Sequence, residues 1–234
     1  MNRKVLSGFF LLFLLFPGAL IAQNESTDSL PADPHYREDQ FYLGLSVNFL
    51  SQLPKGIDQS GFSGSAHFGF LRDMPVNNRR NVGFALGAGL SINTYNQNLK
   101  IDDTGTETSF SRLDNDDFNS NGFSTYIAEV PFQLRWRTST QQKNKFWRIY
   151  LGFKAGYLFY FKSNFESGET SISVNSPNGL QRWRYSLTFS GGYSKVNFYL
   201  DYSLNNLFSD ITMDAGSYPV QIQPIKAGLI FYIL

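Results

Sequence analysis

The feature that most constrains this chain is an alternation of apolar with small or polar residues, which begins at Phe41 and recurs to the C-terminus. Successive side chains of a β-strand point to opposite faces, so a period of two predicts strands that are apolar on one face. No stretch of helical period interrupts the series, which indicates an all-β chain. The apolar faces of the eight segments begin at Phe41, Phe62, Val82, Tyr126, Trp147, Trp183, Val196 and Ile225.

The clearest segment runs from Val82 to Asn93 and opposes large apolar residues to glycine, alanine and serine. A helix is disfavoured there, because each interior glycine costs about 1 kcal/mol relative to alanine. The fifth segment is expected to keep its apolar residues on one face from Trp147 through Phe161. In the fourth segment Pro131 falls on the polar face and predicts a β-bulge, since proline cannot donate a hydrogen bond to the ladder.

The residues of the second face indicate whether these strands belong to a soluble protein or to a membrane protein. Solvated faces favour long charged residues and threonine, whereas here glycine, serine, alanine and asparagine predominate, and the chain has 20 glycines with 17% aromatic residues. Small residues suit the crowded interior of a narrow barrel whose apolar face is turned to hydrocarbon. We therefore expect an eight-stranded antiparallel up-and-down transmembrane β-barrel. The alternative, a soluble lipocalin-like binding barrel, requires the apolar face to point inward.

Scattered charged residues on the inward face predict a structural charge network in the lumen. In so narrow a space, opposite charges are expected to pair, with Glu129 and Asp201 as the acidic partners. The predicted network comprises Glu129, Arg135, Arg137, Arg148, Lys154, Arg182, Arg184, Asp201 and Lys226. The same basic residues motivate a second interpretation, in which the lumen is a small porin-like channel.

The connections alternate between short and long, as do the periplasmic turns and external loops of outer-membrane barrels. An even number of strands then places both termini in the periplasm. The short connections are 72–80, 138–145 and 193–195, and the longer ones are 51–60, 96–121, 163–179 and 206–221.

The N-terminus has the pattern of an export signal. Arg3 and Lys4 give a basic start, and an almost wholly apolar run follows before polarity returns. This predicts a cleavable signal peptide over residues 1–22, with an uncleaved helical anchor as the alternative. Residues 23–40 are polar and proline-containing, which predicts a periplasmic lead-in and assigns residues 41–234 to the barrel.

Composition excludes several classes of function. The chain has no cysteine, which rules out disulfides, thiolate zinc sites and a cysteine nucleophile. The net charge is +1 and only 17% of the residues are charged, so we expect no nucleic-acid partner.

Candidate catalytic and metal-binding residues are few. His35 is expected to be solvated and His67 to be a hydrogen-bonded lumen histidine, with no serine-centred motif beside it, so we expect no enzyme and no catalytic residue. An acidic run in the longest loop is expected to be solvated rather than to bind calcium, because Phe118 stands where an oxygen ligand belongs. That run comprises Asp102, Asp103, Asp114, Asp116 and Asp117. We expect no metal and no cofactor.

Two segments carry a resemblance to a known family. Residues 129–135, with the sequence EVPFQLR, and residues 150–157, with the sequence YLGFKAGY, resemble the PorT-like outer-membrane β-barrel family of the Bacteroidota. The resemblance implies a barrel in the outer membrane of a Gram-negative bacterium and, for the namesake branch, a part in type IX protein secretion and gliding. The chain departs from the general outer-membrane pattern by ending in Leu234 where a terminal aromatic residue is commoner.

These observations predict a non-enzymatic outer-membrane barrel that acts through its loops and partners as an accessory of secretion or surface machinery. The expected partners are outer-membrane lipid, the barrel assembly machinery and other outer-membrane or secretion components. The small channel and the soluble binding barrel remain the alternatives.

Overall fold

The computed structural model describes the barrel and most of its connections. The predicted signal peptide, residues 1–22, lies outside the described residues, as do His35, Asp116 and Asp117. Across the part of the chain that is described, no helix has the length and apolar character needed to span a membrane. The described residues are 39–77, 79–103, 108–114, 118–138, 147–209, 211–213 and 218–233.

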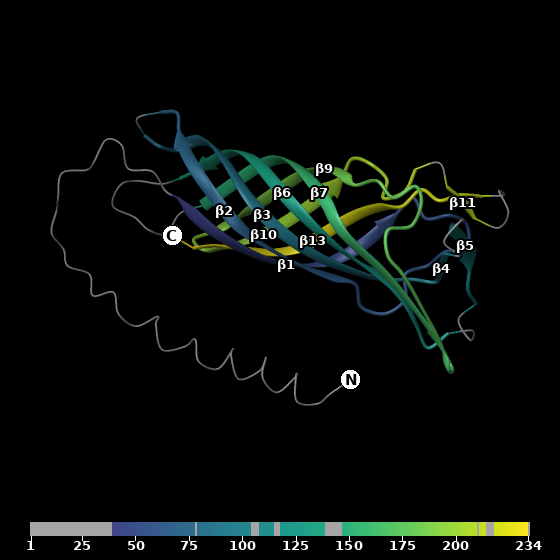
Figure 1. Cartoon of the computed structure of the whole chain (residues 1–234). Helices are drawn as coiled ribbons and strands as arrows, with labels where there is room; N and C mark the ends of the chain where they lie inside the picture. Colours follow the sequence, from purple (N-terminus) through teal and green to yellow (C-terminus); the bar gives the residue numbers. More distant parts are fainter. Residues whose placement is uncertain are drawn as a thin grey trace, which may run out of the picture. The chain divides into compact units, whose positions relative to one another are not determined.

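Eight antiparallel strands form a closed barrel (Figure 1). Each of these strands pairs with the next one along the chain, and β13 pairs with β1 to close the ring. This arrangement confirms the predicted eight-stranded up-and-down barrel. The barrel strands are β1 (Gln40–Ser51), β2 (Gly64–Pro75), β3 (Val82–Asn96), β6 (Ser120–Arg137), β7 (Trp147–Ser167), β9 (Trp183–Tyr193), β10 (Val196–Ser203) and β13 (Gln223–Ile233).

The apolar face of the barrel points outward and the small and polar face points inward. On β3, Leu86 is 48% exposed, whereas the neighbouring Ala85 is completely buried. The same alternation of exposed and buried residues runs along β1 and β10. The soluble lipocalin-like alternative required the reverse orientation, and it is therefore wrong.

A β-bulge in β7 reverses this alternation near one end of the barrel. The register between β6 and β7 shifts by one residue between Tyr126 and Ile127, and Phe159 is the extra residue. One additional residue turns every later side chain to the opposite face. Phe161 is consequently buried at 1% exposure, and its predicted outward position is wrong.

Pro131 does not produce the predicted bulge. It pairs with Lys154 on β7, and the flanking β3 pairs Leu86↔Phe132 and Gly89↔Glu129 keep one register. The missing N–H of proline is therefore accommodated without an inserted residue.

The connections at the end of the barrel that holds Gln40 and Ile233 are short. β2 continues to Pro75, so the predicted connection over 72–80 begins later than expected. Ser194 and Lys195 form a two-residue hairpin turn in which Ser194 has a φ of 58°, a left-handed conformation typical of such turns.

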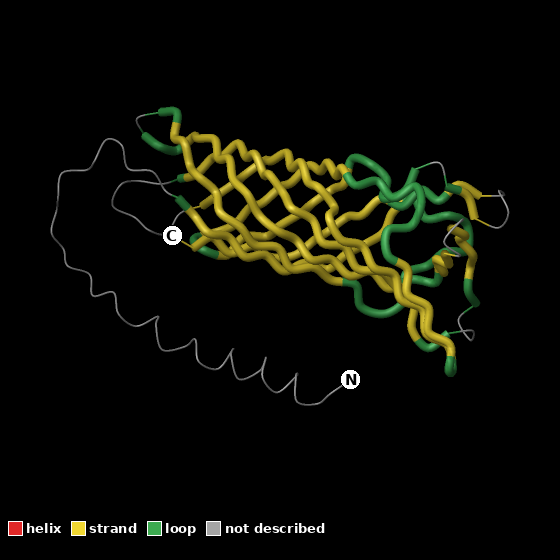
Figure 2. The backbone as a smooth tube through the Cα atoms, viewed as in Figure 1, coloured by secondary structure: helices red, strands yellow, loops and turns green. Residues whose placement is uncertain are grey.

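The connections at the opposite end form further strands rather than simple loops (Figures 1 and 2). β4 (Leu99–Asp103) pairs with β5 (Thr108–Arg112), and β8 (Thr170–Val174) extends the sheet beside β7. β11 (Thr212–Met213) pairs with β12 (Tyr218–Pro219). We call this group of segments the cap.

The cap has its own apolar core, which continues into the outer end of the lumen. Its residues come from all four long connections and from inward positions of the barrel strands. We call this set the cap core: Leu50, Ile57, Tyr95, Leu99, Ile101, Phe110, Phe123, Ile127, Leu158, Phe161, Val174, Leu207, Phe208, Met213, Val220 and Ile222. The long connection over residues 96–121 is polar in composition, as predicted, but its β4–β5 hairpin also supplies Leu99, Ile101 and Phe110 to the cap core.

Candidate functional site in the barrel lumen

Inward-facing glycines make room for large rings in the lumen. A Cβ on Gly89 would lie 2.0 Å from the hydroxyl of Tyr42, and one on Gly44 would lie 2.1 Å from Nε2 of His67. The lumen is therefore packed with side chains where these glycines lie, as expected for eight strands.

His67 lies inside the barrel, as predicted from its position on the polar face of the second segment. Its ring centroid is 4.5 Å from that of Tyr199. Among the described residues, Nε2 of His67 has no hydrogen-bond partner, so ring packing holds this side chain. This differs from the hydrogen-bonded histidine that we expected.

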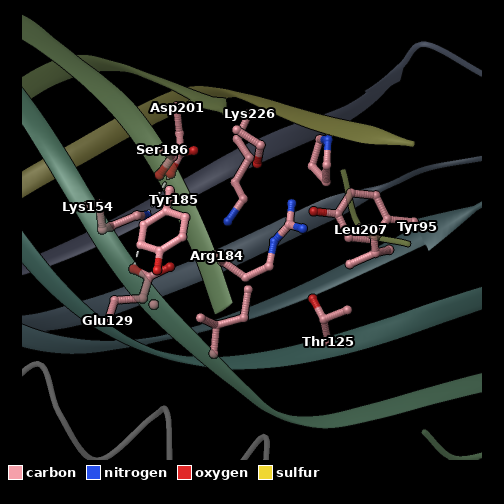
Figure 3. A pocket seen from close by; sticks show the side chains of 14 residues that line it. Tyr95, Thr125, Glu129, Lys154, Arg184, Tyr185, Ser186, Asp201, Leu207 and Lys226 are labelled. Atoms are coloured by element: carbon pink, nitrogen blue, oxygen red, sulfur yellow. Dashed lines mark hydrogen bonds and ion pairs between the residues drawn. The ribbon is translucent and has the colours of Figure 1, made fainter. Parts of the chain in front are cut away.

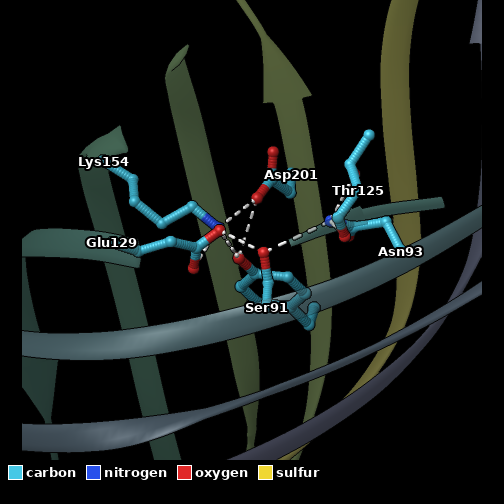
Figure 4. Close-up of polar contacts among 7 residues, drawn as sticks. Ser91, Asn93, Thr125, Glu129, Lys154 and Asp201 are labelled. Atoms are coloured by element: carbon cyan, nitrogen blue, oxygen red, sulfur yellow. Dashed lines mark hydrogen bonds and ion pairs between the residues drawn. The ribbon is translucent and has the colours of Figure 1, made fainter. Parts of the chain in front are cut away.

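Three charged residues at the middle of the lumen form what we call the central cluster, namely Glu129, Lys154 and Asp201 (Figure 4). Lys154 Nζ lies 3.0 Å from Glu129 Oε2 and 2.6 Å from Asp201 Oδ2. Ser91 donates to Glu129 at 2.8 Å, and the Tyr199 hydroxyl donates to Asp201 at 3.1 Å. One ammonium thus bridges two carboxylates that come from different strands, and neutral donors complete their coordination.

A second group near the chain ends forms what we call the basal cluster, namely Asp73, Arg135 and Arg137. Asp73 Oδ1 lies 3.0 Å from Arg135 Nη1, and Asp73 Oδ2 lies 2.8 Å from Arg137 Nη2. Arg135 also donates from Nε and Nη2 to Gln133 Oε1, and its guanidinium lies over the ring of Tyr150 at 4.7 Å. One aspartate thus serves two guanidiniums, with a neutral amide and an aromatic ring around them.

Asp73 was missed because Arg72 and Pro75 interrupt the apolar alternation, and this part of β2 was assigned to a connection. Glu129 and Asp201 both pair with Lys154, one of the cations of the predicted network, whereas Arg135 and Arg137 pair with Asp73 instead. The sequence did indicate the inward position of Asp73. Because Asp73 lies an even number of positions along the strand from His67 and Gly69, all three side chains point to the same face of the strand.

Of the other predicted network residues, Arg184 and Lys226 line the same cavity as the central cluster, and Arg148 pairs in register with Arg137 of the basal cluster. Arg184 donates to the backbone carbonyls of Asn205 and Asn206, and Arg182 precedes β9 and donates to Ser176. The Arg148 guanidinium lies 5.9 Å from the ring centroid of Tyr232. Lys226 is buried and faces a small cavity described below. The predicted network is therefore divided into two ion clusters, with further cations beside them.

A cavity separates the central cluster from the cap core (Figure 3). It has a volume of about 20 Å³, which is room for one water molecule. Glu129, Lys154 and Asp201 line one side, and Tyr95 and Leu207 line the other. At this level, side chains fill most of the lumen and leave a space of about the size of one water molecule.

Asp102, Asp103 and Asp114, the described members of the acidic run that we weighed for calcium binding, form no metal-binding group in the part of the chain that the structure describes. Within the described ranges, no three His, Asp or Glu side chains lie close enough together to hold a metal ion. Asp102 pairs with Lys100 at 3.1 Å and Asp114 with Arg112 at 3.2 Å. These cap carboxylates thus have cationic neighbours at the protein surface.

Comparison with protein families agrees with this geometry. The model of the outer membrane protein beta-barrel domain matches residues 21–209 of the chain. The chain belongs to this family. A search of curated proteins found no match. Membership makes the outward apolar surface the hydrocarbon-facing surface of an outer membrane barrel.

Aromatic residues lie at both ends of this outer membrane barrel. Trp147 packs edge-on against Tyr193 beside the short turns, with ring centroids 5.5 Å apart. Tyr157 and Trp183 form a similar pair nearer the cap, at 5.3 Å. Exposed aromatic residues at two levels are typical of the girdles that contact the two membrane interfaces.

Proposed function

We propose that this outer membrane barrel is a non-enzymatic, closed scaffold that presents its cap to partners as an accessory of type IX protein secretion or of surface machinery. The single observation that carries the proposal is the filling of the lumen. Two ion clusters, a cavity for one water molecule and an apolar cap core follow one another along the barrel. A barrel closed in this way acts through its surfaces.

The cap supports a role in recognition. All four long connections contribute buried residues to one core, for example Ile57, Leu99, Val174 and Ile222. A shared core orders the described parts of these connections relative to one another, and such preorganisation lowers the entropy lost when a partner binds. The proposed binding surface is therefore the outer side of the cap.

The PorT-like resemblance supports the secretion role. In the fold, the segment 129–135 that carries the resemblance supplies Glu129 to the central cluster and Arg135 to the basal cluster. The resemblance therefore rests on residues that fill the lumen.

The role is tested by comparing the secreted proteins of strains with and without the gene. Loss of cargo proteins from the medium, restored by the wild-type gene, is the expected result. An unchanged secretome would overturn the secretion role while leaving the closed scaffold intact.

The closed lumen is tested separately by planar-bilayer recording of the refolded protein. We expect no discrete conductance. Regular single-channel steps would overturn the scaffold and favour the small porin-like channel, whose basic lining would be Arg184 and Lys226.

The absence of cysteine makes the orientation testable. We propose that both termini lie in the periplasm, with the cap outside. Ser171→Cys on exposed β8 should react with a membrane-impermeant maleimide on intact cells, whereas Ser194→Cys in the short turn should react only after lysis. The reverse labelling pattern would contradict this orientation.

A further inference from the structure

The side chain of Lys226 lies in the lumen without a direct partner. It is only 5% exposed and lines the cavity between the central cluster and the cap core (Figure 3). In the described part of the chain, no hydrogen bond and no carboxylate within 4.0 Å satisfies its ammonium group. Asp201, its partner in the β10–β13 register, is bound through Oδ2 to Lys154 and Tyr199.

The charges around the cavity do not balance. Its lining includes two carboxylates, Glu129 and Asp201, and three cations, Lys154, Arg184 and Lys226. Lys154 is shared by both carboxylates. Arg184 bonds to backbone carbonyls, which carry no formal charge. One positive charge is thus left over in a buried space, where an uncompensated charge is strongly unfavourable.

The cavity suits a single small anion. Its volume of about 20 Å³ leaves room for one particle of roughly the size of water, so a monatomic anion suits it better than phosphate, sulfate or a carboxylate ligand. Lys226 can donate to a particle at this place, and the hydroxyls of Thr125, Ser186 and Ser203 line the same space. Water there could accept a hydrogen bond from the ammonium, but only an anion would also remove the excess charge.

We infer that the cavity binds a monatomic anion, chloride under physiological conditions, held by the ammonium of Lys226. The site lies between the central cluster and the cap core, two filled layers of the lumen, and the ion would stay bound there in the folded barrel. Chloride is therefore a structural component of the lumen rather than a transported ion. This inference is independent of the proposed role in secretion.

The test is to refold the full chain into detergent micelles in potassium chloride, potassium bromide or potassium gluconate at equal ionic strength. The midpoint of thermal unfolding should rise with halide concentration and stay constant in gluconate. Lys226→Met should abolish the halide dependence, whereas Lys195→Met at the exposed turn should retain it. Equal midpoints for the wild-type protein in all three salts would overturn the inference.

A second measurement does not depend on the folding of any variant. Crystals of the wild-type protein grown in bromide should show an anomalous peak beside Nζ of Lys226. A map without that peak would mean that Lys226 is a neutral amine in contact with water, and the anion site would be abandoned.

Discussion

Asp73 and Arg135 form a buried ion pair, 3.0 Å long, that reaches across β3 from β2 to β6. The register explains the reach: Asp73 pairs with Ala85, and Ala85 pairs in turn with Gln133. At this level β3 places only a methyl group in the lumen, and Arg135 pairs with Gly83, which has no side chain. The small residues on β3 therefore leave room for an ion pair between β2 and β6, which are not adjacent in the sheet.

Replacing Asp73 with alanine should destabilise the barrel by about 3–5 kcal/mol, because two buried guanidiniums lose their shared carboxylate. Urea unfolding of the refolded protein in micelles measures the change. Asp114→Ala is the matched control, since Asp114 belongs to a surface pair that is worth about 0–1 kcal/mol. Equal losses in the two variants would contradict the structural role of the basal cluster.

Leu86→Arg should cost about 2–4 kcal/mol, since it places a charge on the hydrocarbon-facing surface near the middle of β3. The same unfolding experiment measures this cost, with Ser171→Arg on exposed β8 as a control of near-zero effect. Gly87→Arg should prevent folding, because even a Cβ at this position would lie 1.9 Å from the carbonyl oxygen of Phe70. A harmless Leu86→Arg would mean that this face does not contact lipid.

Lys154→Met should destabilise the protein by about 3–5 kcal/mol at neutral pH, because Glu129 and Asp201 lose their common counter-charge. The loss of stability relative to the wild-type protein should be smaller at acidic pH. Without Lys154 the folded state holds more protons on these carboxyl groups than the unfolded state does, and such a state gains stability as the pH falls.

Unfolding midpoints of wild type and Lys154→Met across a pH series check this prediction. Lys195→Met provides a control that should follow the wild-type profile. A deficit that stays constant with pH would show that the two carboxylates are not held in charged form by Lys154.

Phe208→Ala should loosen the cap and leave the barrel closed. Phe208 is buried in the cap core and packs against Phe110 with ring centroids 5.2 Å apart, so its removal should cost the cap about 3–5 kcal/mol. Limited proteolysis should then cut within the long connections, while the heat-dependent gel mobility of the barrel persists. Phe159→Ala on the lipid-facing surface should leave the cap resistant, and equal cleavage of both variants would argue against a shared cap core.

The sequence predicted the eight barrel strands and their two faces because lipid and a crowded lumen impose opposite requirements on alternate residues. It failed where a single residue changes this pattern. Phe161 was predicted to face the lipid because no sequence feature indicates that Phe159 is an extra residue at a β-bulge. Asp73 was placed in a turn because Arg72 occupies an outward position at the end of β2, beyond the apolar segment.

The cap could not be predicted from periodicity. Its buried residues, such as Leu99, Phe110 and Ile222, are isolated among polar neighbours and come from connections distant in sequence. Only the closed barrel brings those connections together. The candidate site was also only partly predictable. The inward position of Lys226 follows from the alternation along its strand, whereas the cavity that it faces depends on the packing of Tyr95 and Leu207.

Val220 and Ile222 come directly before β13, the strand whose pairing with β1 completes the ring. The cap therefore cannot finish its interior until the last strand has reached the first. A barrel stalled before this seam is joined would leave Val220 and Ile222 without their packing partners, and its apolar cap residues would be accessible to proteases. Protease resistance of the long connections would therefore report, from outside the barrel wall, that the wall itself has closed.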